Sequence, residues 1–312
     1  ADFTCKNLDG SPCDSANGGL NISPSGPAEN SSGNAITVTG EITGANIITG
    51  AWNTTGDATS NKVTLDGTTS PHSLYGDRIM GALQNGASGK TEGNAVVIQG
   101  SPELHGFAIF GSFIDNTKNA DSANGNSVTI TDSTVHLNGG QFPPYMAGVF
   151  HQGSGETSEN ALRIENSAIT GNGSNFLFGA YGKGVAKNNQ VVISSSVLTN
   201  IPFVMGAYST GASDASGNSV TLSGVTAPST IVYGAYAGGK ASGNTVRLVG
   251  AASTLEAIIA GHGAQSSSNN KLEVSVAGNQ AAGIGGVQLI EFNVPGYSDK
   301  SMLTLIDADE GG

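Results

Sequence analysis

Charge is scarce in this sequence, and positive charge is the scarcest. Of the 312 residues, 12 are Lys or Arg and 24 are Asp or Glu, which gives a formal net charge of −12. Such a surface repels a phosphate backbone, so we expect no nucleic-acid partner. No apolar run approaches the roughly 20 residues that a membrane-spanning helix needs.

Proline and cysteine are also few. The chain has 10 prolines beside 47 glycines, which excludes a collagen-like chain and a proline-rich linker. The cysteines are Cys5 and Cys13, and no histidine lies near them in the sequence, which disfavours a zinc site. A short disulfide is favoured over two free thiols, and it implies an oxidising compartment. The opening residues ADFTC are compatible with a mature N-terminus left after signal cleavage.

What the sequence does contain is a repeat anchored on asparagine. The second and fourth residues after each anchor are aliphatic, as Val191 and Ile193 are after Asn189. This period of two predicts a strand with one buried face. The anchors are Asn34, Asn61, Asn94, Asn126, Asn160, Asn189, Asn218, Asn244 and Asn270.

A second strand in each unit carries a glycine, with an aliphatic residue two positions earlier, as Leu177 precedes Gly179. A shorter Ser/Thr-x-Val/Ile piece lies between the two strands. Units this small cannot each bury a core, but stacked units can. The sequence therefore predicts an all-β fold: a single parallel β-helix of about nine coils, with three strands per coil.

The asparagines share the parity of the buried aliphatics, so we expect them to point inward at a bend of the coil. Stacked amides can hydrogen-bond from one coil to the next, and asparagine tolerates the left-handed conformation that sharp bends need. We expect the glycines to leave room for a neighbouring aromatic ring or for a close backbone approach.

Aromatic and methionine side chains flank the glycines in two columns. The column two residues after each glycine has the parity of the core and is expected to form an internal stack; Tyr181 and Tyr208 belong to it. The column one residue before each glycine has the opposite parity, and we predict that it forms an exposed contact surface. A bend at the glycine would instead turn this column into the core. The proposed contact residues are Met80, Phe110, Phe178, Met205 and Tyr233.

Phrases such as VYGAYAGGKASGNTVRLVG and FVMGAYSTGASDASGNSVTLSG resemble the passenger repeats of bacterial autotransporters, the type V secretion family. The likeness covers residues 31–285 and implies a right-handed coil there. We also expect a disulfide-bearing cap at 1–30 that shields the first coil, and an irregular end at 286–312. The likeness further implies a secreted or cell-surface location on a Gram-negative bacterium, and attachment to an outer-membrane barrel whose alternating strands are missing from this sequence. The function it implies is adhesion to a host or bacterial receptor, protein or glycan, or self-association.

Two other functions stay open: a passive stalk and a polysaccharide hydrolase or lyase. The motif GHG at 261–263 resembles one element of polygalacturonases, but their aspartate pair is missing. The segment 119–127 is rich in Asn, Asp and Gly, but it lacks the regular acidic spacing of a calcium-binding loop. We therefore predict no catalytic residue, no metal and no cofactor. The carboxylates considered for catalysis are Asp115, Asp121 and Asp132, and the histidines, scattered without ligand spacing, are His72, His105, His136, His151 and His262.

Overall fold

The computed structural model describes residues 3–4, 20–22, 30–39, 42–68, 73–100, 103–137, 144–281, 283–292 and 303–305. Every regular element within these ranges is a β-strand, and none of them contains a helix long and apolar enough to cross a membrane. The predicted disulfide between Cys5 and Cys13 falls outside the described residues.

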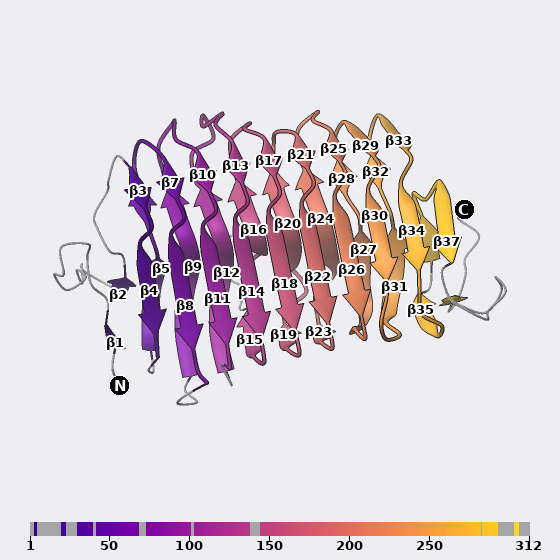
Figure 1. The fold of residues 1–312 in the computed structure, drawn as a ribbon, viewed down its shortest axis with the longest axis horizontal. Helices are drawn as coiled ribbons and strands as arrows, with labels where there is room; N and C mark the ends of the chain where they lie inside the picture. The colour runs from indigo at the N-terminus through magenta and orange to yellow at the C-terminus, as the bar shows by residue number, and fades with distance from the viewer. Residues whose placement is uncertain are drawn as a thin grey trace.

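The chain winds into a parallel β-solenoid of about eight turns, close to the nine that the asparagine anchors predict. Like strands of successive coils lie side by side along the long axis, and the colour runs from indigo to yellow along that axis (Figure 1). Three sheets result, which we call the long, short and bent sheets.

The long sheet carries the strand that follows each asparagine anchor. Its strands pair in register, for example Val191 with Val220, and all pairs are parallel except β1 with β4. The order is β1 (Phe3–Thr4), β4 (Ala35–Val38), β8 (Lys62–Asp66), β11 (Ala95–Gln99), β14 (Ser127–Thr131), β18 (Ala161–Glu165), β22 (Gln190–Ser194), β26 (Ser219–Ser223), β30 (Thr245–Leu248), β34 (Lys271–Val274) and β37 (Leu289–Phe292).

The short sheet lies just before each anchor, and most of its strands are two residues long. Its order is β3 (Ser31–Ser32), β7 (Ala58–Thr59), β10 (Thr91–Glu92), β13 (Ala123–Asn124), β17 (Thr157–Ser158), β21 (Ala186–Lys187), β25 (Ala215–Ser216), β29 (Lys240–Ser242) and β33 (Ser266–Ser268).

The bent sheet carries the glycine column, and in most coils its strand is split into shorter pieces. These are β2 (Leu20–Ile22), β5 (Ile42–Thr49), β6 (Trp52–Asn53), β9 (Ser73–Gln84), β12 (Glu103–Ile114), β15 (Thr134–Leu137), β16 (Met146–His151), β19 (Ala168–Thr170), β20 (Phe176–Gly182), β23 (Val197–Thr199), β24 (Phe203–Ser209), β27 (Thr226–Tyr233), β28 (Tyr236–Ala237), β31 (Thr254–Ile259), β32 (His262–Gly263), β35 (Asn279–Ala281), β36 (Gly283–Gly285) and β38 (Leu303–Leu305).

The main core fills the space between the long and bent sheets. It consists of the predicted aliphatic residues, for example Val191 and Ile193 of β22 and Leu177 of β20, all almost fully buried. A narrower core of alanines, including Ala186, Ala207 and Ala215, lies between the short sheet and the part of the bent sheet beyond the glycine. The alternating aliphatic pattern therefore predicted the buried face correctly.

The asparagine anchors form a continuous ladder inside the bend between the short and long sheets. Nδ2 of Asn189 donates to Oδ1 of Asn218 at 3.0 Å, and the backbone N–H of Asn189 donates to the same oxygen at 2.9 Å. The second hydrogen on Nδ2 bonds the carbonyl oxygen of Thr157 at 3.0 Å. The same pattern links every successive anchor from Asn34 to Asn270, in agreement with the predicted ladder.

The left-handed backbone conformation, however, is adopted by the residue before each anchor and not by the anchor itself. Glu159 has a φ of 58° and Asn188 a φ of 54°, next to Asn160 and Asn189. The expectation that the anchoring asparagine takes this conformation was therefore wrong. The residue that precedes it makes the turn, and the amide of the asparagine reaches the neighbouring coil. The residues in this conformation are Gly33, Ser60, Gly93, Gly125, Glu159, Asn188, Gly217, Gly243 and Asn269.

Candidate functional site

The proposed contact column lies on the outer face of the bent sheet, as its parity predicts. In β20, Leu177 enters the main core, whereas Phe176 and Phe178 belong to a separate apolar cluster on the opposite face of the strand. Met80, Phe110 and Met205 belong to this outer cluster too, and the partly exposed Tyr233 packs against it.

The strand bends at its glycine, so that side chains on both sides of the bend converge. Residues three apart on a straight strand point to opposite faces. Here the ring centroids of Phe178 and Tyr181 are 5.6 Å apart. Those of Tyr233 and Tyr236 are 6.0 Å apart. The outer face of the bent sheet is therefore concave along the glycine column.

The glycine is required because of the close approach of backbones at this bend. A Cβ on Gly179 would lie 2.4 Å from the carbonyl oxygen of Gly206 and 2.8 Å from backbone atoms of Gln190. Such distances are too short for a real Cβ, so no larger residue fits without a backbone shift. Of the two roles considered for these glycines, the close backbone approach is the one that the structure shows.

Aromatic side chains from consecutive coils fill this concave face and touch one another without a break. Neighbouring coils are about 4.8 Å apart, so the contacts extend about 24 Å along the solenoid. We call this surface the aromatic trough. Its rings are those of Phe110, Phe113, Tyr145, Phe150, Phe176, Phe178, Tyr181, Phe203, Tyr208, Tyr233, Tyr236 and His262.

The trough has a buried floor and a partly exposed rim. The expectation that the column before the glycines is an exposed stripe was wrong for four of its members, because rings from both sides of the bend close over them. Met80, Phe110 and Phe178 are 0% exposed and Met205 is 5% exposed, whereas Tyr233 is half-buried. These four side chains form the floor.

Three tyrosines of the rim are residues that the parity of a straight strand would place inside. Tyr181, Tyr208 and Tyr236 were expected to form an internal stack, but they lie in the outer cluster and are half-buried. The physical reason is the bend at the glycine, which reverses the alternation. Phe176 and Phe203, three residues before the glycines, complete the rim and were not predicted as site residues.

The trough is nearly neutral. Burial raises the pKa of Tyr145, Tyr181, Tyr208 and Tyr233 above the usual value of 10.0, so these phenols keep their protons at neutral pH. Partly buried tyrosines combine an apolar ring face with a hydroxyl group that can donate or accept a hydrogen bond. The trough can therefore pack against apolar faces of a ligand and bond its hydroxyl groups.

The carboxylates considered for catalysis make separate hydrogen bonds. Asp115 follows β12 and accepts from Gln152 Nε2 at 3.1 Å. Burial raises the pKa of Asp115, and the positive charge of Arg78 opposes that rise. Oδ2 of Asp121 accepts from the backbone N–H of Gly89 at 2.6 Å, within a turn. Asp115 and Asp121 therefore each hydrogen-bond to a neighbouring part of the protein.

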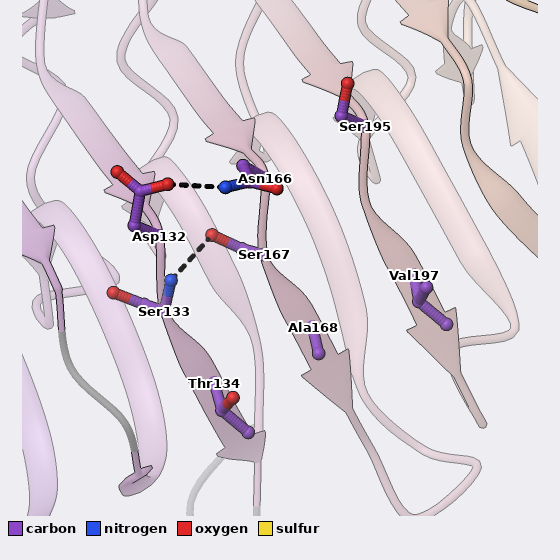
Figure 2. A pocket seen from close by; sticks show the side chains of 8 residues that line it. All are labelled: Asp132, Ser133, Thr134, Asn166, Ser167, Ala168, Ser195 and Val197. Atoms are coloured by element: carbon purple, nitrogen blue, oxygen red, sulfur yellow. Dashed lines mark hydrogen bonds between the residues drawn. The ribbon is translucent and has the colours of Figure 1, made fainter.

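Asp132 lines a shallow open groove at the corner between the long and bent sheets (Figure 2). Its Oδ1 accepts from Asn166 Nδ2 at 2.6 Å, and Ser167 Oγ accepts from the backbone N–H of Ser133 at 3.1 Å. The serine contact repeats in the next coil, where Ser196 Oγ accepts from Ser167 N–H at 3.1 Å. This second polar ladder was missed, although the recurring Ser/Thr-x-Val/Ile piece was its signal. The groove therefore lies where consecutive coils turn from the long sheet into the bent sheet.

Comparison of this chain with protein-family models, with curated proteins and with solved structures finds no match.

Proposed function

We propose that this chain is a surface-exposed bacterial adhesin, the passenger of an autotransporter, and that its coil is right-handed. We further propose that the aromatic trough is its binding surface. The observation that carries the proposal is the unbroken row of half-buried rings along one outer face. Soluble proteins rarely keep extended apolar patches in contact with water unless the patch binds something. Aromatic side chains are also enriched in the cores of binding interfaces.

The ligand that best fits this surface is an extended, uncharged glycan on another cell. A linear polymer of sugar rings matches a linear surface on which ring contacts recur over successive coils. The apolar C–H faces of sugars pack against aromatic rings, and their hydroxyl groups bond phenols. The near absence of charged groups on the rim disfavours strongly charged ligands, because a buried unpaired charge costs free energy.

Adhesion of cells to the immobilised full-length chain tests the proposal. The double variant Tyr181→Ser with Tyr208→Ser should reduce adhesion at least about tenfold, the loss expected when central contact residues are removed. The matched control is Thr129→Ala with Thr221→Ala, on the outer face of the long sheet. A soluble neutral oligosaccharide mixture should compete with the wild-type chain.

Each other outcome counts against the proposal. Unchanged adhesion in the trough variant would exclude the trough as the binding surface. Absence of adhesion by the wild-type chain would favour a passive stalk. The trough variant could lose adhesion while the oligosaccharides fail to compete with the wild-type chain. If the wild-type chain also associates with itself in a concentration-dependent way in sedimentation, the ligand of the trough is a second copy of the chain and not a glycan. Release of reducing or unsaturated sugar ends from a polysaccharide would favour the enzyme alternative.

A further inference from the structure

A second cluster of chemically active side chains lies on the same outer face as the trough, on β12 and β15. Glu103 and His105 belong to β12, and His136 belongs to β15. The two strands are parallel neighbours, and His105 pairs directly with His136. Leu104 and Val135 point into the main core, so the histidines beside them face outward.

The three side chains are close enough to share one ion. The imidazole rings of His105 and His136 stack with centroids 4.8 Å apart and planes 17° apart. Nε2 of His105 lies 2.7 Å from Oε1 of Glu103. One ligand atom from each of the three residues lies within 4.8 Å of the others. No sequence motif indicated this site, because His105 and His136 are far apart in the chain and become neighbours only through the stacking of coils.

We propose that Glu103, His105 and His136 bind a divalent first-row transition-metal cation, with zinc as the reference ion. Two imidazole nitrogens and one carboxylate oxygen are a ligand set typical of zinc centres that keep a fourth position open. With zinc bonds of 2.0–2.2 Å, tetrahedral ligand atoms lie about 3.3 Å apart. Reaching that spacing requires the Glu103–His105 contact of 2.7 Å to open slightly and the three side chains to turn toward one ion.

These adjustments are available because the side chains are on the surface of a sheet whose backbone is fixed. The side chain of His105 is 20% exposed and that of Glu103 is 46% exposed, so an ion can enter from solvent. In the absence of an ion, His105 Nε2 and Glu103 Oε1 share a hydrogen bond. A bound cation would take the place of the hydrogen between these two atoms. The fourth position would then accept water or an oxygen atom of a bound molecule.

Isothermal titration of the full-length, metal-stripped chain with zinc chloride tests this proposal. We expect one saturable site per chain. His105→Ala and His136→Ala should each weaken zinc binding at least about tenfold, since even the loss of a residue that only supports a ligand costs 10- to 100-fold. Cobalt(II) should give visible absorption bands in the wild-type chain that disappear in the same variants.

Two control variants keep the test specific. Thr170→Ala alters the position paired with His136 in the next coil, and His262→Ala removes an exposed imidazole from the trough; both should bind zinc like the wild-type chain. His136→Asn serves as a second variant if the alanine variant does not fold, which circular dichroism shows. Absence of saturable binding would overturn the proposal. So would undiminished binding in His105→Ala with His136→Ala, which would assign the ion to other ligands.

Discussion

The rings of Phe150 and Tyr181 stack face to face across neighbouring coils, with centroids 4.2 Å apart and planes 1° apart. Phe150 is 3% exposed, whereas Tyr181 is half-buried. Such a contact contributes about 0.5–1.5 kcal/mol beyond the area that it buries. The trough therefore both joins the coils and presents rings to solvent. Its floor and its rim should respond differently to substitution.

Removal of a floor residue should destabilise the protein. Phe178→Ala removes a ring that is 0% exposed, and the loss of a buried Phe costs about 3–5 kcal/mol. Tyr208→Ala removes a half-buried rim ring and should cost clearly less. Chemical denaturation followed by circular dichroism measures both. Equal effects of the two variants would contradict the distinction between floor and rim.

The asparagine ladder should be stabilising at each step. Asn189→Ala removes the oxygen that accepts from the amide and the backbone N–H of Asn160, at 2.9 Å and 3.0 Å. Unpaired buried donors cost about 1–3 kcal/mol, so the denaturation midpoint should fall accordingly. The control Thr221→Ala, on the outer face of the long sheet, should change stability by no more than about 0.5 kcal/mol. An unchanged midpoint for Asn189→Ala would exclude a structural role for the ladder.

The bend at the glycine should tolerate no side chain. Gly179→Ala places a Cβ 2.4 Å from the carbonyl oxygen of Gly206, and forced overpacking typically costs about 1–3 kcal/mol. Gly283→Ala is the matched control, because a Cβ there meets no atom within 4 Å. Thermal denaturation of the two variants gives the comparison. A wild-type melting temperature for Gly179→Ala would show that the backbones at the bend can separate without cost.

Stability should decrease in mild acid partly because of His151. This side chain is 0% exposed, its Nδ1 accepts from Gly153 N–H at 3.0 Å, and its Nε2 donates to the carbonyl oxygen of Asp121 at 2.8 Å. Burial lowers the pKa of His151 below 6.5. Below pH 6.5 the unfolded chain therefore binds a proton that the folded chain resists, and the free energy of unfolding falls by at most about 1.4 kcal/mol per pH unit.

His151→Gln isolates this effect, because Gln84 makes the equivalent bonds at a corresponding position of an earlier coil. Oε1 of Gln84 accepts from Gly86 N–H at 2.9 Å, and its Nε2 donates to the carbonyl oxygen of Gly56. Urea denaturation between pH 7 and pH 4.5 should show a shallower loss of stability in the variant than in the wild-type chain. Parallel pH profiles would contradict the proposed role of His151.

The fold could be predicted from the sequence because a solenoid repeats the same local signals. The aliphatic pairs after each asparagine, as at Val191 and Ile193, predicted the buried face of the long sheet. The asparagine itself predicted the ladder, since its parity matches that of the core. Each of these features depends only on neighbouring residues and on the stacking of equal units.

The candidate site could be predicted only in part, because it depends on geometry that strand parity does not contain. Parity placed Phe178 on the outer face correctly, but the bend at Gly179 buried it and brought Tyr181 to the same face. Likewise, His105 and His136 become neighbours only through the register of β12 with β15. The length of each turn determines that register, and no local pattern specifies it.

Protection of the trough on binding tests the central claim most directly. Hydroxyl-radical labelling of the chain, free in solution and bound to the cells to which it adheres, can be measured residue by residue with mass spectrometry. We predict that labelling of Tyr181, Tyr208 and Tyr236 falls severalfold in the bound chain, while labelling of the exposed Val197 and Leu289 stays the same. Unchanged labelling of the three tyrosines in a chain that is demonstrably bound would contradict the account.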